Sequence, residues 1–189
     1  MIKIILASGS PRRKQLLEWA EVPFEVKAKS TDESYPAGLL PQEVAIHIAR
    51  NKALAVVNDC PKDSVILAAD TIVVLDQRII GKPADREDAI DILAALSGQH
   101  HRVITGVAIR KNDREKTFSD STTVQFHSLT RKEIEYYIDK YKPYDKAGAY
   151  AIQEWIGVVG IQSVQGDFYN VMGLPVSRVV RELQLFESL

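Results

Sequence analysis

The chain has almost no cysteine: Cys60 is the only one among 189 residues, so no intrachain disulfide can form. Small secreted domains commonly depend on disulfides, whereas a lone thiol suits a reducing compartment. The first residues also run in the wrong order for an export signal, because the apolar stretch 2–6 precedes the basic Arg12 and Arg13. These features favour a cytoplasmic protein.

Long apolar runs and an excess of one charge are missing too. The longest apolar run, residues 65–75, contains Asp70 and Thr71 and is shorter than the roughly 20 residues that a membrane-spanning helix needs. Lysine and arginine number 24 against 25 acidic residues, so no overall positive field attracts nucleic acid. We predict neither a membrane nor a nucleic-acid partner, and any anionic ligand must be bound by a local cluster of residues.

Repeats, low-complexity stretches and Gly/Ser linkers are absent as well, which favours a single domain over residues 1–189. Hydrophobic periodicity and turn residues predict alternating strands and helices. The strands are expected at 2–6, 24–28, 64–75, 78–80, 101–110, 117–126 and 158–164, and the helices at 11–20, 41–57, 85–96, 130–141 and 175–186. This order predicts an α/β fold with a mixed, twisted sheet and flanking helices.

A cluster of cations follows the first expected strand. Pro11 favours a helix start, and Ser10 before it can cap the helix. Helix N-termini bind anions, and two arginines, Arg12 and Arg13, are unfavourable there unless an anion neutralises them. With the hydroxyl of Ser8, these groups predict a phosphate pocket. A solvated basic turn is the alternative.

Asp70 lies inside the nearly continuous apolar run 65–75, which predicts a strand buried on both faces. A carboxylate in such a strand costs several kcal/mol unless it meets a metal, a cation or hydrogen bonds. Such a cost usually indicates function, so Asp70 is the first candidate for catalysis. The alternative is that the strand ends near Ala69 and Asp70 lies in a surface bend.

Two lysines are candidates for the same site. Lys52 interrupts the apolar stripe of the helix expected at 41–57, and from there its ammonium could reach Asp70. A lysine in that position could equally extend its stem along the apolar face to solvent. Lys82 follows a short apolar strand inside a Gly/Pro turn that would fix its position.

Glu33 lies in a polar loop and is, by itself, compatible with a solvated acid. Paired with Asp70, it would supply oxygen ligands for Mg²⁺ or Mn²⁺, which often join one or two carboxylates to substrate phosphates. The four histidines lack the spacing of a transition-metal site. Later in the chain, the segment 145–153 combines charges, small residues and the amide of Gln153. It predicts either close approach to a ligand or a packed turn.

Taken together, these segments resemble the Maf family of nucleotide pyrophosphatases over essentially the whole chain. The resemblance rests on ordered blocks of short motifs. They are Ala7-Ser8-Gly9-Ser10-Pro11-Arg12-Arg13, the loop of Glu33, Ala69-Asp70-Thr71, Gly81-Lys82-Pro83, Ser97-Gly98, Val103-Ile104-Thr105-Gly106, Asp145-Lys146-Ala147-Gly148-Ala149-Tyr150 and Val171-Met172-Gly173-Leu174-Pro175.

The resemblance implies a fold similar to that of inosine triphosphate pyrophosphatases, with two lobes around a central cleft, and a homodimer. It also implies hydrolysis of a nucleoside triphosphate at the α–β phosphoanhydride with a divalent metal. The site residues that we derive from it together with the motifs fall into two groups. The catalytic set is Asp70, Glu33, Lys52 and Lys82, with Asp70 and Glu33 also holding the metal; the substrate-binding set is Ser8, Arg12, Arg13, Thr71 and Gln153.

Within that family, the branch acting on dTTP and UTP resembles this chain most, because Arg12, Thr71 and Gln153 match its specificity positions. The Gln153 amide offers a donor and an acceptor, which suit the imide edge of thymine or uracil. A different class of function is open as an alternative. The chain could be a nucleotide-binding regulator of cell division or septum formation, with hydrolysis secondary.

Overall fold

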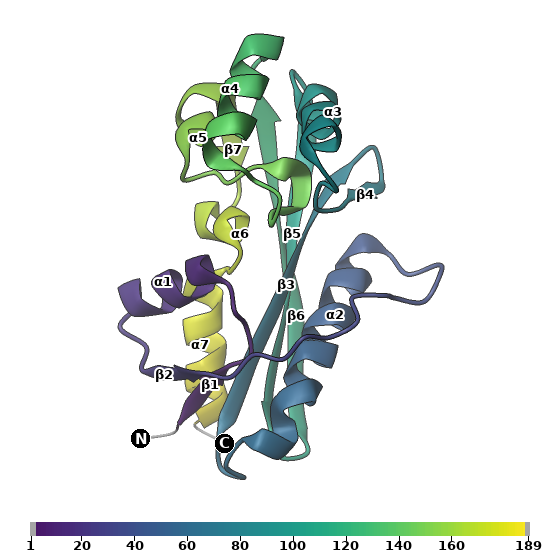
Figure 1. Cartoon of the computed structure of the whole chain (residues 1–189). Helices are drawn as coiled ribbons and strands as arrows, with labels where there is room; N and C mark the ends of the chain where they lie inside the picture. Colours follow the sequence, from purple (N-terminus) through teal and green to yellow (C-terminus); the bar gives the residue numbers. More distant parts are fainter. Residues whose placement is uncertain (1–2, 188–189) are drawn as a thin grey trace. The chain divides into compact units, whose positions relative to one another are not determined.

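The computed structural model describes residues 3–187 and shows a mixed α/β fold. Seven strands form one sheet in the order β2-β1-β3-β5-β6-β7, with β4 paired to β3 (Figure 1). The strands are β1 (Ile4–Leu6), β2 (Phe24–Val26), β3 (Val65–Leu75), β4 (Arg78–Ile80), β5 (His100–Lys111), β6 (Arg114–Phe126) and β7 (Ile161–Gln165). The helices are α1 (Pro11–Trp19), α2 (Pro41–Val56), α3 (Arg86–Leu96), α4 (Arg131–Tyr141), α5 (Trp155–Gly160), α6 (Phe168–Met172) and α7 (Val176–Glu187), with short 3₁₀ turns η1 (Val57–Asp59) and η2 (Ala147–Ala149).

The chain divides into two compact units, which agrees with the two lobes expected; the central cleft stays a prediction. Unit 1 comprises the residues up to Thr71, the segment Thr105–Asp120 and the residues from Gly173 onward. Unit 2 comprises Ile72–Ile104 and Ser121–Met172. Strands β3, β5 and β6 each contribute residues to both units.

In unit 1, β1 pairs in parallel with both β2 and β3. Helix α2 packs on one face of these strands through small and branched side chains. This core cluster comprises Ile5, Ala7, Ala49, Ala53, Val56, Ile66, Ala68 and Ala108. Close approach of α2 to β5 depends on Gly106, where a Cβ would come within 2.3 Å of the Ala45 carbonyl carbon. Packing of the apolar stripe of α2 therefore determines which way Lys52, on the same helix, points relative to the sheet.

In unit 2, β3 ends in a two-residue hairpin to β4. Its turn residues Asp76 and Gln77 have φ values of 46° and 67°, the left-handed conformation that such tight hairpins require. Strand β7 pairs antiparallel with β6, and α3 contacts α4. The short strand expected at 78–80 is thereby confirmed, as the partner of β3.

Most expected elements are confirmed within a few residues, and one is wrong in part. The run 158–164 was expected to be a strand throughout, but α5 covers Trp155–Gly160 and only Ile161–Gln165 forms β7. At the start of this helix Gly157 lies against the backbone of Ile152, where a Cβ would meet the carbonyl oxygen at 1.7 Å, so the close local turn needs a glycine there. Ile2 of the first expected strand lies outside the described residues. None of the helices within residues 3–187 meets the length and hydropathy needed to cross a membrane.

Candidate active site

Asp70 lies within β3, five residues before the end of the strand, and is 8% exposed. The strand continues without a break through Ala69 to Leu75, so the alternative of a surface bend is wrong. The two residues before it, Ala68 and Ala69, are fully buried. The structure thus confirms that the sequence places a carboxylate in a buried strand, a placement that needs compensating charge.

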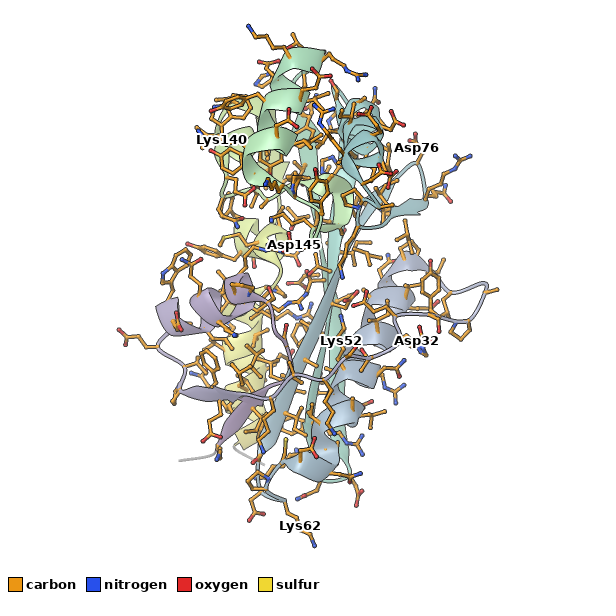
Figure 2. The ribbon with its side chains drawn as sticks, viewed as in Figure 1. Asp32, Lys52, Lys62, Asp76, Lys140 and Asp145 are labelled. Atoms are coloured by element: carbon orange, nitrogen blue, oxygen red, sulfur yellow. The ribbon has the colours of Figure 1, made fainter. Side chains whose placement is uncertain are left out.

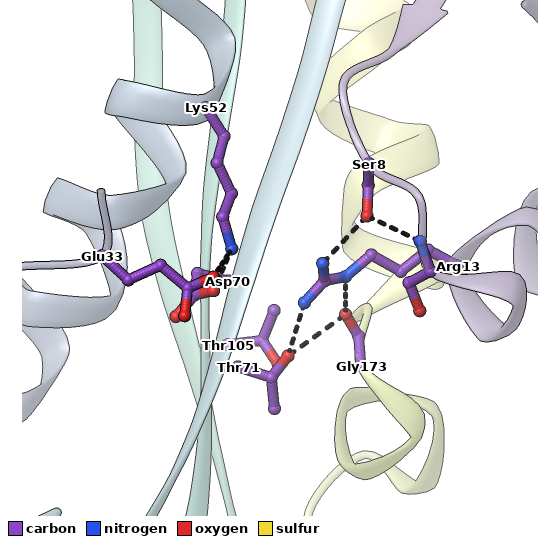
Figure 3. Close-up of polar contacts among 9 residues, drawn as sticks. Ser8, Arg13, Glu33, Lys52, Asp70, Thr71, Thr105 and Gly173 are labelled. Atoms are coloured by element: carbon purple, nitrogen blue, oxygen red, sulfur yellow. Dashed lines mark hydrogen bonds and ion pairs between the residues drawn. The ribbon is translucent and has the colours of Figure 1, made fainter. Parts of the chain in front are cut away.

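Lys52 supplies that charge (Figure 3). Its Nζ lies 2.5 Å from Asp70 Oδ1 and 2.8 Å from Glu33 Oε1. The lysine side chain is 17% exposed and that of Asp70 is 12% exposed, so solvent screens their ion pair only weakly. Lys52 therefore projects from α2 toward the sheet, as its interruption of the apolar stripe predicted, and gathers two carboxylates around one cation.

Arg13 forms a second polar cluster on the other side of β3 in Figure 3. Its Nε donates to the Gly173 carbonyl at 2.7 Å, Nη1 to Ser8 Oγ at 3.0 Å and Nη2 to Thr71 Oγ1 at 3.1 Å. Burial lowers the pKa of the Arg13 guanidinium, while the negative charge of Asp70 opposes that shift. The side chain thus binds the loop of Ser8 to β3 and to the start of the C-terminal segment.

The turn before α1 differs from expectation in one respect. Ser10 occupies the N-cap position, but its side chain makes no capping hydrogen bond. Instead, the Ser10 backbone N–H donates to Ser8 Oγ at 3.3 Å. The Ser8 hydroxyl therefore orders the turn before α1, because it accepts from both the Ser10 backbone and Arg13. Arg12, which directly precedes Arg13 on α1, is half-buried, and its charge further lowers the pKa of Arg13.

Thr105 and Gly173 belong to this cluster although sequence reasoning did not place them in the site. Thr71 Oγ1 lies 2.8 Å from Thr105 Oγ1 and donates to the Gly173 carbonyl at 3.3 Å. Thr105 is fully buried on β5. A threonine between the apolar Ile104 and the close-packed Gly106 was the available signal, since a buried hydroxyl needs a partner.

Lys82 and Gln153 lie in unit 2, and both are exposed. The Gly148 N–H donates to the Gly81 carbonyl at 3.0 Å, which attaches the segment before Gln153 to the turn of Lys82. Glu154, directly after Gln153, accepts a short hydrogen bond from the Tyr137 hydroxyl. The segment 145–153 can therefore be a packed turn and also approach a ligand, because its packed backbone holds the side-chain amide of Gln153 at the surface.

The donor set of Glu33 and Asp70 fits a hard divalent cation. Within residues 3–187 there is no group of three or more histidine, cysteine or acidic residues that could hold a metal by itself. Mg²⁺ and Mn²⁺ commonly take only one or two carboxylates and complete their coordination with water and substrate phosphates. The carboxylates of Glu33 and Asp70 already contact one cation, the Lys52 ammonium, so their position suits positive charge.

The fold and these clusters define an α/β protein with a charged site suited to a phosphate-bearing anion, in which cations and hydroxyls surround a buried carboxylate. A family model described as Maf-like protein matches residues 3–186. The chain belongs to the Maf family.

Relatives with assigned names match the chain over nearly its full length. A protein of Cytophaga hutchinsonii named dTTP/UTP pyrophosphatase is 53% identical over 181 residues, covering 96% of this chain and 83% of the relative. One of Parabacteroides distasonis with the same name is 50% identical over 185 residues, covering 97% and 96%. Among solved structures, the Staphylococcus aureus Ham1 protein matches 66% of this chain and 71% of its own, with 14% identity and a TM-score of 0.48.

Proposed function

We propose that the chain hydrolyses dTTP and UTP to the monophosphate and pyrophosphate. The observation that carries this proposal is the position of Asp70: a buried carboxylate on Lys52 Nζ at 2.5 Å, with Glu33 on the same ammonium. The names of the relatives, at about half identity over almost the whole chain, support the same reaction.

In the proposed reaction, water adds to the α-phosphorus of the triphosphate, and the bond between that phosphorus and the oxygen bridging to the β-phosphorus breaks. Asp70 accepts the proton of the attacking water, and pyrophosphate leaves with the bridging oxygen. Lys52, Arg12 and Lys82 offset the negative charge that the phosphates develop, which is commonly the largest contribution of the protein in such reactions. No cysteine or serine nucleophile is needed.

We propose Glu33 and Asp70 as the residues that hold a divalent cation. Bound there, Mg²⁺ or Mn²⁺ would supply further positive charge to the phosphate oxygens. Lys52 contacts both carboxylates, and its flexible four-carbon stem allows the ammonium to turn toward a phosphate. The two carboxylates would then retain a cationic partner whenever substrate is bound.

Substrate contacts are proposed for Ser8, Arg12, Arg13, Thr71 and Gln153. The bonds of Arg13 to Ser8, Thr71 and Gly173 support a positioning role for its guanidinium. Arg12 lies half-buried in the first turn of α1, where helix N–H groups also favour a phosphate. Gln153 is exposed and lies between the buried Ile152 and Glu154, whose carboxylate accepts a hydrogen bond from Tyr137. A fixed backbone with a free amide suits recognition of the pyrimidine imide edge.

Asp70→Asn tests the proposal, assayed with dTTP, UTP, dCTP and GTP at several Mg²⁺ and Mn²⁺ concentrations while pyrophosphate and orthophosphate are both measured. We expect wild-type protein to release pyrophosphate, with dTTP and UTP preferred. Removing the base should lower kcat by about 10²- to 10⁴-fold. Asp91→Asn, an exposed position on α3, is the matched control and should retain wild-type turnover.

Unchanged turnover in Asp70→Asn would remove Asp70 from the reaction. Release of orthophosphate, with the nucleoside diphosphate remaining, would show that the protein is a phosphatase and not a pyrophosphatase. Tight binding of dTTP by wild-type protein with negligible turnover would favour the nucleotide-binding regulator instead.

A further inference from the structure

Gln153, which is proposed to recognise the pyrimidine, lies in a tight turn of unit 2. Residues 151–154 form this turn, in which the Glu154 backbone N–H donates to the Ala151 carbonyl at 3.1 Å. Ala151 and Ile152 are buried, whereas Gln153 is exposed. The backbone before Gln153 is therefore packed into the unit, while the amide itself reaches the surface.

A single hydroxyl, that of Tyr137 on α4, holds this turn at two points. It accepts a hydrogen bond from the Ala151 backbone N–H at 3.1 Å and donates a short one to Glu154 Oε2. A buried tyrosine hydroxyl usually finds some partner. Here the two partners lie two residues before Gln153 and one residue after it, so the same oxygen attaches both sides of the recognition residue to α4.

The Tyr137 side chain is itself firmly placed. It is fully buried, and its ring stacks on that of Tyr141 with centroids 5.0 Å apart and planes inclined by 25°. Figure 2 shows Lys140 on the same helix and Asp145 in the segment that leads from the helix to the turn. Because α4 fixes the ring and the hydroxyl fixes the turn, the position of Gln153 depends on the core of unit 2.

The attachment through Glu154 is strong because the acceptor is charged. Its Oε2 accepts from Tyr137, and its Oε1 lies 3.8 Å from Lys146 Nζ. The Lys146 side chain is buried and also pairs with Asp145 at 2.7 Å. Hydrogen bonds to an ionised group are roughly twice as strong as those between neutral groups. The carboxylate next to Gln153 is thus engaged at both oxygens and serves as an anchor for the turn.

A glutamine amide by itself does not select between pyrimidines. Its carbonyl and amino ends match the N3–H and O4 of thymine or uracil, and after a half-turn of the amide they match the amino group and N3 of cytosine. A loosely held amide can therefore adapt to either base. Selection requires a backbone that brings the amide to the imide edge in one arrangement.

We propose that Tyr137 is a positioning residue for base selection, which acts through Gln153. This inference rests on the proposed preference for dTTP and UTP, and it assigns part of that preference to a residue outside the substrate-binding set. The phenol hydroxyl fixes the turn, and the fixed turn holds the amide in the arrangement that suits thymine and uracil. Tyr137 itself contacts no substrate in this role.

Tyr137→Phe removes the hydroxyl and keeps the buried ring. The binding of the α,β-methylene analogues of dTTP and dCTP is measured by titration calorimetry with Mg²⁺, so the result does not depend on cleavage. Wild-type protein should prefer the dTTP analogue, and the variant should lose about tenfold of that preference. In turnover with dTTP, KM should rise with kcat nearly unchanged, because the base contacts are the same in the ground state and the transition state.

A double-mutant cycle with Gln153→Ala tests whether Tyr137 acts through the amide. Adding Tyr137→Phe to Gln153→Ala should change the remaining preference by less than about twofold, since the group that it positions is already absent. A merely structural role would instead weaken both analogues alike in both backgrounds. The two arms of the cycle therefore separate positioning of the amide from general loosening of unit 2.

Two further variants control for folding. Tyr136→Phe, the neighbouring position on α4, removes an exposed hydroxyl that accepts from Lys140 at 2.8 Å. It should retain the wild-type preference and melting temperature. Glu154→Ala breaks the bond to Tyr137 from its partly exposed end. It should also lower the preference, so the proposal stays testable if Tyr137→Phe folds poorly.

An unchanged preference in Tyr137→Phe, together with its loss in Gln153→Ala, would overturn the role of Tyr137 and leave the proposed substrates intact. Equal weakening of both analogues by Tyr137→Phe would likewise overturn it, in favour of a structural role. Wild-type protein that binds the two analogues equally would instead refute the proposed preference for dTTP, and the role of Tyr137 with it.

Discussion

Arg13 brings a permanent positive charge into the interior of unit 1, where it is 8% exposed. Its planar guanidinium donates in three directions at once, to Ser8, Thr71 and the Gly173 carbonyl, which lies 160 residues away in the sequence. A lysine could not reproduce that fork, since its ammonium is a single point of charge. The residue therefore positions the loop of Ser8 against β3.

His101 is the titratable residue with the clearest consequence for stability. It is 2% exposed on β5, and its Nε2 lies 2.7 Å from the Tyr150 hydroxyl. Nδ1 has no partner among the described residues. Burial, with a smaller effect of His100, lowers the pKa of His101 to about 4. The neutral imidazole is thus the form that folding favours.

We predict that His101 makes the protein less stable as the pH falls from about 6.5 to about 4. In that window the unfolded chain binds a proton that the folded protein excludes, so the loss could reach about 3 kcal/mol. Urea unfolding of wild type and His101→Gln across this range should show a flatter pH dependence in the variant. His127→Gln, at an exposed position, controls for losing an imidazole. Parallel curves for wild type and His101→Gln would contradict the prediction.

At the scale of elements, the contact between α2 and β5 determines where Lys52 meets Asp70. Gly106 on β5 lies so close to α2 that an added Cβ would be 2.3 Å from the Ala45 carbonyl carbon and 2.4 Å from the Ile46 nitrogen. Both of these atoms are backbone, so a neighbouring side chain cannot yield. Only a displacement of α2 would admit a larger residue.

Gly106→Ala should lower the free energy of unfolding by about 2–3 kcal/mol, through overpacking. For a chain of this length that corresponds to a loss of roughly 5–10 °C in melting temperature, which circular dichroism can measure. A displacement of α2 would also move Lys52 away from Asp70, so kcat should fall as well. Gly9→Ala is the control for stability, since a Cβ there meets nothing within 4 Å. Equal melting temperatures of the two variants would refute the close packing.

The elements that sequence reasoning predicted well are those whose local pattern and tertiary environment agree. Helix α2 begins at Pro41, and β3 reads as one apolar run. Periodicity therefore made the pairing of Lys52 with Asp70 one of two possibilities, and the structure shows it in place of an extension to solvent. Helix α5 was missed because its valines favour a strand, whereas the close approach of Gly157 to the Ile152 backbone is a contact that hydrophobic periodicity does not report. The bonds of Arg13 to Thr71 and Gly173 could not be predicted, because they join segments distant in sequence.

At the scale of the whole molecule, three of the four boundaries between the two units fall inside strands. β3 passes from unit 1 to unit 2 between Thr71 and Ile72, β5 between Ile104 and Thr105, and β6 after Asp120. Ile104 and Thr105 are fully buried. Independent domains usually meet at exposed, flexible linkers. The single domain expected over residues 1–189 is therefore supported by continuous strands, although it stays a prediction.

We predict one cooperative unfolding transition, with equal calorimetric and van't Hoff enthalpies. The two tryptophans allow each unit to be followed by itself, since Trp19 lies in unit 1 and Trp155 in unit 2. Trp19→Phe and Trp155→Phe should give fluorescence midpoints in urea that coincide with each other and with circular dichroism. Adding Gly106→Ala, a change in unit 1, should move both midpoints together, because a strand shared by two units cannot melt in only one of them. A shift confined to the Trp19 signal would instead show that the units unfold separately.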